Sequence, residues 1–228
     1  MANETRFRVG PSSLTEALYE SVRRRIVTGD IKAGEKLTEV RIATEYDVAR
    51  PTAKACLERL VVGGLLRRSA HKTAVVPRLD EAEIRDLFLS RATVEEAAVA
   101  ALAAGRSVPA GAEQAQAAME LAARDRTFDA QVEADIAFHS ALVDGTGSSR
   151  LSRMHHVILG EVQLSMGQYQ AHRTTDPETV AAEHAAVLDA IRAGDPEAAR
   201  TRLRDHLDHA RERLLAARAE PDGQQEPV

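Results

Sequence analysis

The chain has 228 residues, of which 44% are hydrophobic, 29% are charged and 3% are aromatic, and its formal net charge is −5 at pH 7. This is the composition of a globular protein, and it excludes a disordered, collagen-like or low-complexity chain. No segment reaches the run of about 18 uncharged apolar residues that a membrane-spanning helix needs, and the start MANETRFRVG lacks the apolar stretch of a secretory signal. We therefore expect a cytoplasmic protein, with two domains as the better estimate from its length.

Charge is distributed unevenly along the sequence. Residues 1–78 contain 15 basic and 9 acidic side chains, a net charge of +6, whereas residues 79–228 contain 15 basic and 26 acidic ones, a net charge of −11. The first segment also holds all the lysines, namely Lys32, Lys36, Lys54 and Lys72. Such asymmetry is typical of a nucleic-acid-binding domain joined to a different domain. Charge alone does not separate this hypothesis from an ordinary solvated basic surface.

The N-terminal segment predicts three helices with a turn between the second and the third. Ser13 and Glu16 have capping-box spacing, and apolar residues follow at intervals of about four, so a helix is expected to begin at Ser13. A short helix is expected over residues 39–46. Another helix is expected from Arg50, because Pro51 suits the first turn of a helix.

After the third helix, residues 65–79 predict two short strands around a polar tip. The order helix, helix, turn, helix, hairpin is that of a winged helix-turn-helix, whose third helix enters the DNA major groove. We therefore predict a winged helix-turn-helix DNA-binding domain over residues 1–78.

Several side chains of this domain are candidates for contacts with DNA: Arg41, Arg50, Thr52, Lys54, His71 and Lys72. Three of them lie at the start of the predicted recognition helix, where cationic and hydroxyl groups reach base edges or phosphates. Arg41 belongs to the preceding helix, and the last two lie at the hairpin tip, from which a wing touches the minor groove or the backbone. Taken singly, each is also explained as an exposed surface residue.

The sequence from residue 79 to residue 219 is almost entirely of helical type. It is rich in Ala, Leu, Glu and Arg, and it predicts about six helices, over residues 80–104, 109–124, 127–145, 148–171, 177–193 and 196–217. Asp176 and Asp195 each precede a proline, which is typical of a helix start. The fold class is therefore mainly α, with a winged helix-turn-helix followed by an all-α bundle. The polar residues 220–228 are expected to form a disordered tail.

One aspartate and three histidines of the helical segment form a candidate metal site. Asp135 and His139 are four residues apart, so on a helix they share one face and can bind one cation. His184 and His206 lie on two later helices. This donor set suits zinc, nickel or manganese, with positions left open for water or a ligand. Spacing alone, however, favours ordinary core or surface histidines.

The same residues allow a second hypothesis, a metal-dependent hydrolase or other helical metalloenzyme, because an open position on zinc activates water. The sequence contains no Gly-x-Ser-x-Gly, phosphate-loop or His-Glu-x-x-His motif, and Glu183 is expected on a different helical face from His184. The single Cys56 lies in a helical pattern, which favours a buried structural thiol. We therefore predict that the protein is not an enzyme.

The run IVTGDIKAGEKLTEVRIATEYDVARPTAKACLERLVVGGLL resembles the winged helix-turn-helix of GntR-type bacterial transcription regulators in the order and spacing of its residues. The resemblance assigns Arg50 and Lys54 to two arginine positions of the recognition helix, and His71 and Lys72 to the wing. Ala49 stands where the family usually has a serine, which caps a helix better. Because of such departures, the operator sequence is not carried over from relatives.

The helical segment resembles the FCD ligand-binding domain of the FadR-like branch of this family, over most of residues 80–217. The residues that carry the resemblance are the four candidate metal ligands and the run AAVLDAIRAGDPEAA after His184. In that family the matching aspartate and histidines commonly bind a metal at the base of a pocket for small organic acids. The resemblance implies a divalent metal ion, zinc first and nickel or manganese as alternatives.

Arg91 falls where members of this branch often carry an arginine that approaches the carboxylate of the effector. A guanidinium suits bidentate capture of a carboxylate. An ion pair with Glu95, four residues later on the same helix, is the alternative interpretation. With Arg91 included, the resemblance implies a homodimeric, ligand-responsive regulator, most often a repressor, whose two winged domains bind palindromic operator DNA and whose effector is a small carboxylate.

Overall fold

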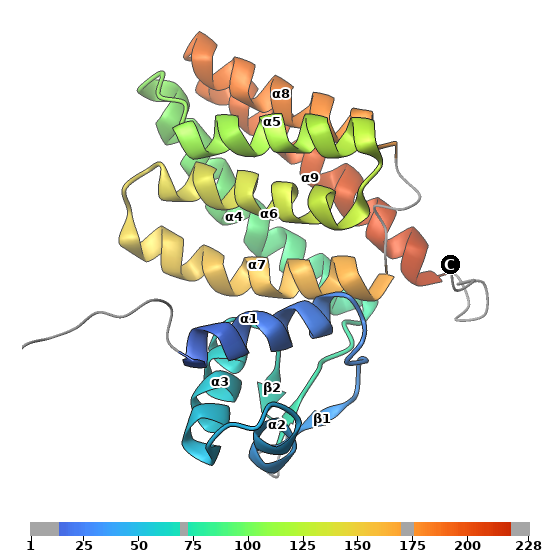
Figure 1. Cartoon of the computed structure of the whole chain (residues 1–228). Coiled ribbons are helices and arrows are strands. Elements are labelled where there is room, and N and C mark those ends of the chain that lie inside the picture. The colour runs from blue at the N-terminus through green and yellow to red at the C-terminus, as the bar shows by residue number, and fades with distance from the viewer. Residues whose placement is uncertain (1–13, 69–72, 170–175, 220–228) are drawn as a thin grey trace, which may run out of the picture. The chain divides into compact units, whose positions relative to one another are not determined.

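The computed structural model describes residues 14–68, 73–169 and 176–219, and the chain divides into two compact units between Pro77 and Arg78 (Figure 1). This division falls one residue before the boundary expected from the sequence. The expected helix start at Ser13, the hairpin tip with His71 and Lys72, and the C-terminal tail lie outside the described residues.

The first unit is a winged helix-turn-helix, as predicted. Its elements are α1 (Leu14–Val27), β1 (Lys36–Leu37), α2 (Glu39–Glu45), α3 (Arg50–Val62), β2 (Arg67–Arg68) and β3 (Ala74–Val75). The strands form an antiparallel sheet in the order β1, β3, β2, in which Ala74 pairs with Leu37 on one side and Arg68 on the other. β1 was not expected, because β2 and β3 are neighbours joined by a polar hairpin tip, whereas β1 pairs with a strand far away in the sequence and has no hairpin signal of its own.

The core of the first unit forms where the apolar faces of the helices meet. Val22 and Ile26 of α1, Ile42 of α2, and Leu57 and Leu60 of α3 are at most 2% exposed. Burying an aliphatic side chain of this size contributes about 1.5–3 kcal/mol. The unit therefore depends on the same periodic apolar residues that predict its helices.

Local contacts fix the ends of α2 and α3. The hydroxyl of Thr38 accepts the backbone N–H of Arg41 at 3.1 Å and so caps α2. Asp47, with φ of 49°, makes the turn in the left-handed region, which aspartate tolerates better than most residues. Ala49 precedes α3 and gives no side-chain cap, and Pro51 lies in the first turn. The start of α3 is therefore set by this turn and by Pro51.

The described part of the second unit is a bundle of six helices, as predicted: α4 (Glu81–Ala104), α5 (Ala110–Asp125), α6 (Phe128–Asp144), α7 (Ser149–Tyr169), α8 (Pro177–Ala193) and α9 (Pro196–Ala219). All bounds lie within two residues of the expected ones. Figure 1 shows α5, α6 and α7 side by side, with α4 and α9 crossing behind them. Among the described residues, no helix is long and apolar enough to cross a membrane.

Aspartate caps start three of these helices. Asp80 and Glu83 form a reciprocal capping box at α4, with both hydrogen bonds at 2.9 Å. Asp176 accepts the N–H of Glu178 before α8, and Asp195 accepts the N–H of Ala198 before α9. Each such cap contributes about 1 kcal/mol to helix stability. The two Asp-Pro pairs seen in the sequence therefore mark helix starts, as predicted.

Candidate metal centre

The structure brings together all four predicted metal ligands in the interior of the bundle. Asp135 and His139 come from α6, His184 from α8 and His206 from α9, and each is at most 1% exposed. Each residue offers one donor atom, and these four atoms all lie within 4.8 Å of one another. The i, i+4 spacing on α6 places the first two on one face, and the packing of α8 and α9 supplies the others.

Three imidazole Nε2 atoms and one carboxylate oxygen converge. The Nε2 atom of His206 lies 3.2 Å from Nε2 of His139 and 3.3 Å from Nε2 of His184. Nε2 of His184 is also 3.4 Å from Oδ1 of Asp135. These separations are those of atoms grouped around one small point, as in a metal coordination shell.

Two carboxylates fix the orientation of two of the histidines. Nδ1 of His139 donates to Oε2 of Glu95 at 2.6 Å, and Nδ1 of His206 donates to Oε2 of Glu183 at 2.8 Å. A carboxylate only accepts, so each Nδ1 carries the proton and each Nε2 presents a lone pair. The lone pairs of His139 and His206 therefore face each other.

Electrostatics keep both histidines neutral near pH 7. Burial, followed by the charge of Arg91, lowers the pKa of His139 to about 4, and burial lowers the pKa of His206 to about 3. No proton then lies between the two facing nitrogens, and a single cation would satisfy both lone pairs at once. The arrangement fits a metal ion with nitrogen ligands.

The other two ligands each have a buried polar atom without a hydrogen-bond partner in the described part of the chain, namely Oδ2 of Asp135 and Nδ1 of His184. Burial raises the pKa of Asp135, but His184, His139 and Arg91 together lower it well below its ordinary value, so the carboxylate is ionised. The ring of His184 stacks on Phe138, with centroids 4.0 Å apart and planes 3° from parallel. Stacking therefore holds this ligand in place.

Arg91 is completely buried beside the four ligands, and the structure shows the ion pair with Glu95 that was the alternative interpretation. Its Nε atom donates to Oε1 of Glu95 at 2.8 Å. Its Nη1 and Nη2 atoms have no hydrogen-bond partner among the described residues, and Nη2 lies 4.0 Å from Oδ2 of Asp135. Only the Nε side of the guanidinium is therefore paired, and its Nη1 and Nη2 groups keep unused N–H donors among the described residues.

The site contains three further polar residues to which the sequence analysis assigned no role in it: Glu95, Glu183 and His155. His155 is 2% exposed, and its Nε2 atom lies 2.8 Å from Oε1 of Glu95. A signal was present, because His155 is four residues from Leu151 and from Leu159 and so lies on the apolar face of α7. The spacing of Glu95, four residues after Arg91 on one helix, predicts only their ion pair.

Acid is expected to destabilise the metal-free bundle as the pH falls from 6.5 towards 4. In the unfolded chain the histidines take up protons below their ordinary pKa of 6.5, whereas His139 and His206 stay neutral in the folded protein down to about 4 and about 3. The unfolded state then binds more protons, so the free energy of unfolding decreases as the pH decreases. Urea unfolding of the chelator-treated protein at pH 7 and pH 5 measures this decrease in the free energy of unfolding. His139→Gln should make the decrease smaller. Equal free energies of unfolding at the two pH values would contradict the prediction.

The first unit presents two of the predicted DNA contacts directly. Arg50 and Lys54 are exposed at the start of α3, and Thr52 is half-buried between them. Lys54 lies 3.9 Å from Glu58 on the exposed face, a pair that solvent weakens. The predicted contacts His71 and Lys72 belong to the segment that the structure does not describe.

Arg41 is placed differently from the other candidates. Its guanidinium is 2.7 Å from a carboxylate oxygen of Glu45 and 3.0 Å from one of Glu35, and it also donates to the carbonyl of Lys36. The side chain therefore ties α2 to β1, and contact with DNA would require it to leave these partners. Cys56 is fully buried, and burial raises the pKa of its thiol to about 11, so the thiol is unreactive.

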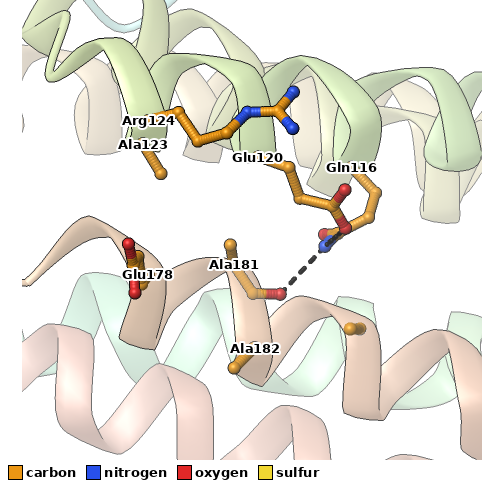
Figure 2. Close-up of a pocket in the computed structure, with 8 residues that line it drawn as sticks. Gln116, Glu120, Ala123, Arg124, Glu178, Ala181 and Ala182 are labelled. Carbon is orange, nitrogen blue, oxygen red and sulfur yellow. Dashed lines mark hydrogen bonds between the residues drawn. The ribbon is translucent and has the colours of Figure 1, made fainter.

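An open groove of about 300 Å³ lies on the surface between α5 and α8 (Figure 2). Its floor is formed by alanines, and Gln116 crosses it to donate to the carbonyl of Ala181 at 2.9 Å. Its rim carries Glu120 and Glu178 together with Arg124, so both signs of charge are present. None of the predicted site residues lines this groove.

A winged helix-turn-helix with an exposed basic recognition helix, joined to a helical bundle with a buried polar centre, defines a DNA-binding transcription regulator with a separate effector domain. Family models agree: residues 14–76 match "Bacterial regulatory proteins, gntR family", and residues 86–209 match the FCD domain. The protein belongs to the GntR family and carries an FCD domain. Members of this family regulate transcription and are not enzymes.

Relatives and solved structures share this organisation. The chain is 27% identical to the "Putative L-lactate dehydrogenase operon regulatory protein" of Escherichia coli, over 86% of this chain and 84% of that protein. It is also 27% identical to the transcriptional regulator BphR of Paraburkholderia xenovorans, over 86% of this chain and 83% of that protein. A crystal structure of a GntR regulator from Rhodococcus superposes with a TM-score of 0.76, at 25% identity, over 92% of this chain and all of the other.

Proposed function

We propose that the protein is a homodimeric repressor that binds a palindromic operator and is regulated by a small carboxylate, which it senses through a metal ion in the FCD domain. The observation that carries the proposal is the pair of facing lone pairs on His139 and His206, beside the unpaired Nη1 and Nη2 groups of Arg91. Among its described residues, such a centre leaves two lone pairs that can bind a cation and two N–H donor groups that can bind an anion. A metal and a carboxylate together supply them.

The metal ligands are proposed to be Asp135, His139, His184 and His206. Three imidazoles and one carboxylate suit a borderline divalent cation, and we propose zinc, with nickel or manganese as alternatives. When bound, the metal supplies positive charge and an acceptor site for an oxygen ligand. The protein holds the donors in a dry interior, where a charge acts more strongly than in water.

The charge balance of the centre favours a monoanion. A divalent ion and Arg91 supply three positive charges, and Asp135 and Glu95 supply two negative charges. Arg213, 3.6 Å from Glu183, offsets the charge of that carboxylate, so one positive charge is left in the interior. A single carboxylate neutralises it, with the Nη1 and Nη2 groups of Arg91 available for a bidentate hydrogen bond. The name of the Escherichia coli relative makes small hydroxy acids such as lactate the first candidates for a ligand screen.

Two copies of the winged domain suit a symmetric operator, because the symmetry of a dimer is repeated in its site. The bound acid is proposed to favour one arrangement of the FCD helices over another and so to change the spacing of the winged domains. This requires the acid to bind the two arrangements with unequal affinity. Since an operator is chromosomal DNA, the proposed site of action is the cytoplasm.

Fluorescence anisotropy at a fixed, stated salt concentration tests the proposal. A labelled duplex from the region upstream of the protein's own gene is compared with a scrambled duplex of equal length, because phosphate contacts alone give binding that depends on salt but not on sequence. We expect a preference for the upstream duplex of about 100-fold or more, within the range of specific regulators. Addition of small carboxylates to the zinc-loaded complex then identifies the effector. Equal, weak binding of both duplexes would contradict an operator in this region.

A further inference from the structure

Glu95 is the point at which the centre is connected to three helices. It lies on α4, is completely buried, and accepts hydrogen bonds from residues of α4, α6 and α7. We infer that Glu95 is the positioning residue that sets the metal affinity of the site, by holding the metal-binding nitrogen of His139 in place. The inference rests on the proposed metal site and adds a residue to it that is not a ligand.

The two carboxylate oxygens of Glu95 accept hydrogen bonds from different donors. Among the residues that the structure describes, Oε2 accepts only the Nδ1–H of His139, at 2.6 Å. Oε1 accepts the Nε–H of Arg91 and the Nε2–H of His155, both at 2.8 Å. Rotation of the carboxylate would break bonds on both sides, so the two outer donors lock the oxygen that orients His139.

The outer donors also compensate the charge of Glu95 in the interior. An isolated buried carboxylate is costly. Here Arg91, which is cationic, and His155 both donate to Glu95 at 2.8 Å, so the carboxylate is buried together with a cation and hydrogen-bond donors. A charged acceptor increases the basicity of the imidazole that donates to it, and this strengthens the bond from the opposite nitrogen to a metal.

Glu183 provides an internal comparison. It orients His206 in the same way, at 2.8 Å, but its side chain is 17% exposed and also contacts His209, which is 61% exposed. Its outer contacts are the exposed His209 and the partly exposed Arg213, 3.6 Å away, so apart from His206 no buried donor among the described residues fixes its position. Removing the charge of Glu183 should therefore disturb the metal site less than removing the charge of Glu95.

The test compares zinc affinity in the wild-type full-length chain, Glu95→Gln and Glu183→Gln, by competition with a chromophoric chelator. We expect Glu95→Gln to bind zinc about 10–100-fold more weakly, the range found for residues that orient metal ligands, and Glu183→Gln to lose less. The visible absorption spectrum of the cobalt-loaded proteins is a second readout, since it changes when a ligand is displaced. Circular dichroism and thermal unfolding establish that each variant is folded.

Each result decides one point. A wild-type protein that binds no zinc, cobalt, nickel or manganese would remove the proposed metal site itself. If the wild type binds zinc, a folded Glu95→Gln variant with affinity within about threefold and an unchanged cobalt spectrum overturns the role of Glu95. Should Glu95→Gln fail to fold, His155→Leu takes its place, because it removes one outer donor and touches no ligand. Weaker zinc binding by His155→Leu then supports the inference, and unchanged binding overturns it.

Discussion

Replacing His184 by alanine is expected to abolish metal binding, with a loss of affinity greater than about 100-fold, because a ligand matters more than the residues that orient it. The change removes one of three converging nitrogens and leaves Nε2 of His206 without its neighbour at 3.3 Å. It also removes the ring that stacks on Phe138, so the domain should lose thermal stability. Zinc content after dialysis and chelator competition measure the effect.

His156→Ala is the matched control, because this histidine is exposed on α7 and contributes no atom to the cluster. The control should keep full metal affinity. In the proposed mechanism the His184 variant also keeps its basal affinity for the operator but no longer responds to the effector, since the two functions belong to different units. Loss of operator binding with metal retained would contradict this separation.

Replacing Arg50 by alanine is expected to weaken operator binding by about 1–3 kcal/mol, or about 5- to 150-fold, if the guanidinium makes a bidentate contact with a base. Arg50 is exposed at the first position of α3 and is not in an ion pair with any described residue, so it can reach DNA without breaking an internal contact. Anisotropy at constant salt measures the change.

Arg24→Ala serves as the control for charge, since Arg24 is an exposed arginine of the same unit on α1. It should reduce affinity only slightly and equally for specific and scrambled duplexes, as expected for the loss of a general positive charge. Arg50→Ala should instead reduce the preference between the two duplexes. An unchanged affinity would remove Arg50 from the set of DNA contacts.

The long helices were predictable because their signal repeats over many residues. In both α8 and α9, the Asp-Pro start and the periodic apolar face indicate a helix. The bounds of these two helices lie within two residues of the expected ones. β1 was not predictable, because a two-residue strand is created by its partner β3 and not by its own pattern.

The centre was predictable only in part, for a similar reason. Asp135 and His139 share a helix, so their spacing carries information. His184 and His206 were candidates from the sequence, but only the resemblance to the FCD domain favoured a metal site over ordinary histidines. Glu95 and His155 are 60 residues apart, and nothing local connects them. Contacts of this kind arise from helix packing, which a single sequence does not display.

The centre joins distant parts of the chain, since His139 and His206 are 67 residues apart. In the proposed metal site, a cation held between them would act as a removable cross-link that closes a long loop, and such links stabilise a fold mainly by restricting the unfolded chain. Because His206 belongs to the last helix, this cross-link can be closed only after α9 has been made and has packed against α8. Metal uptake would then mark the end of folding of the FCD domain.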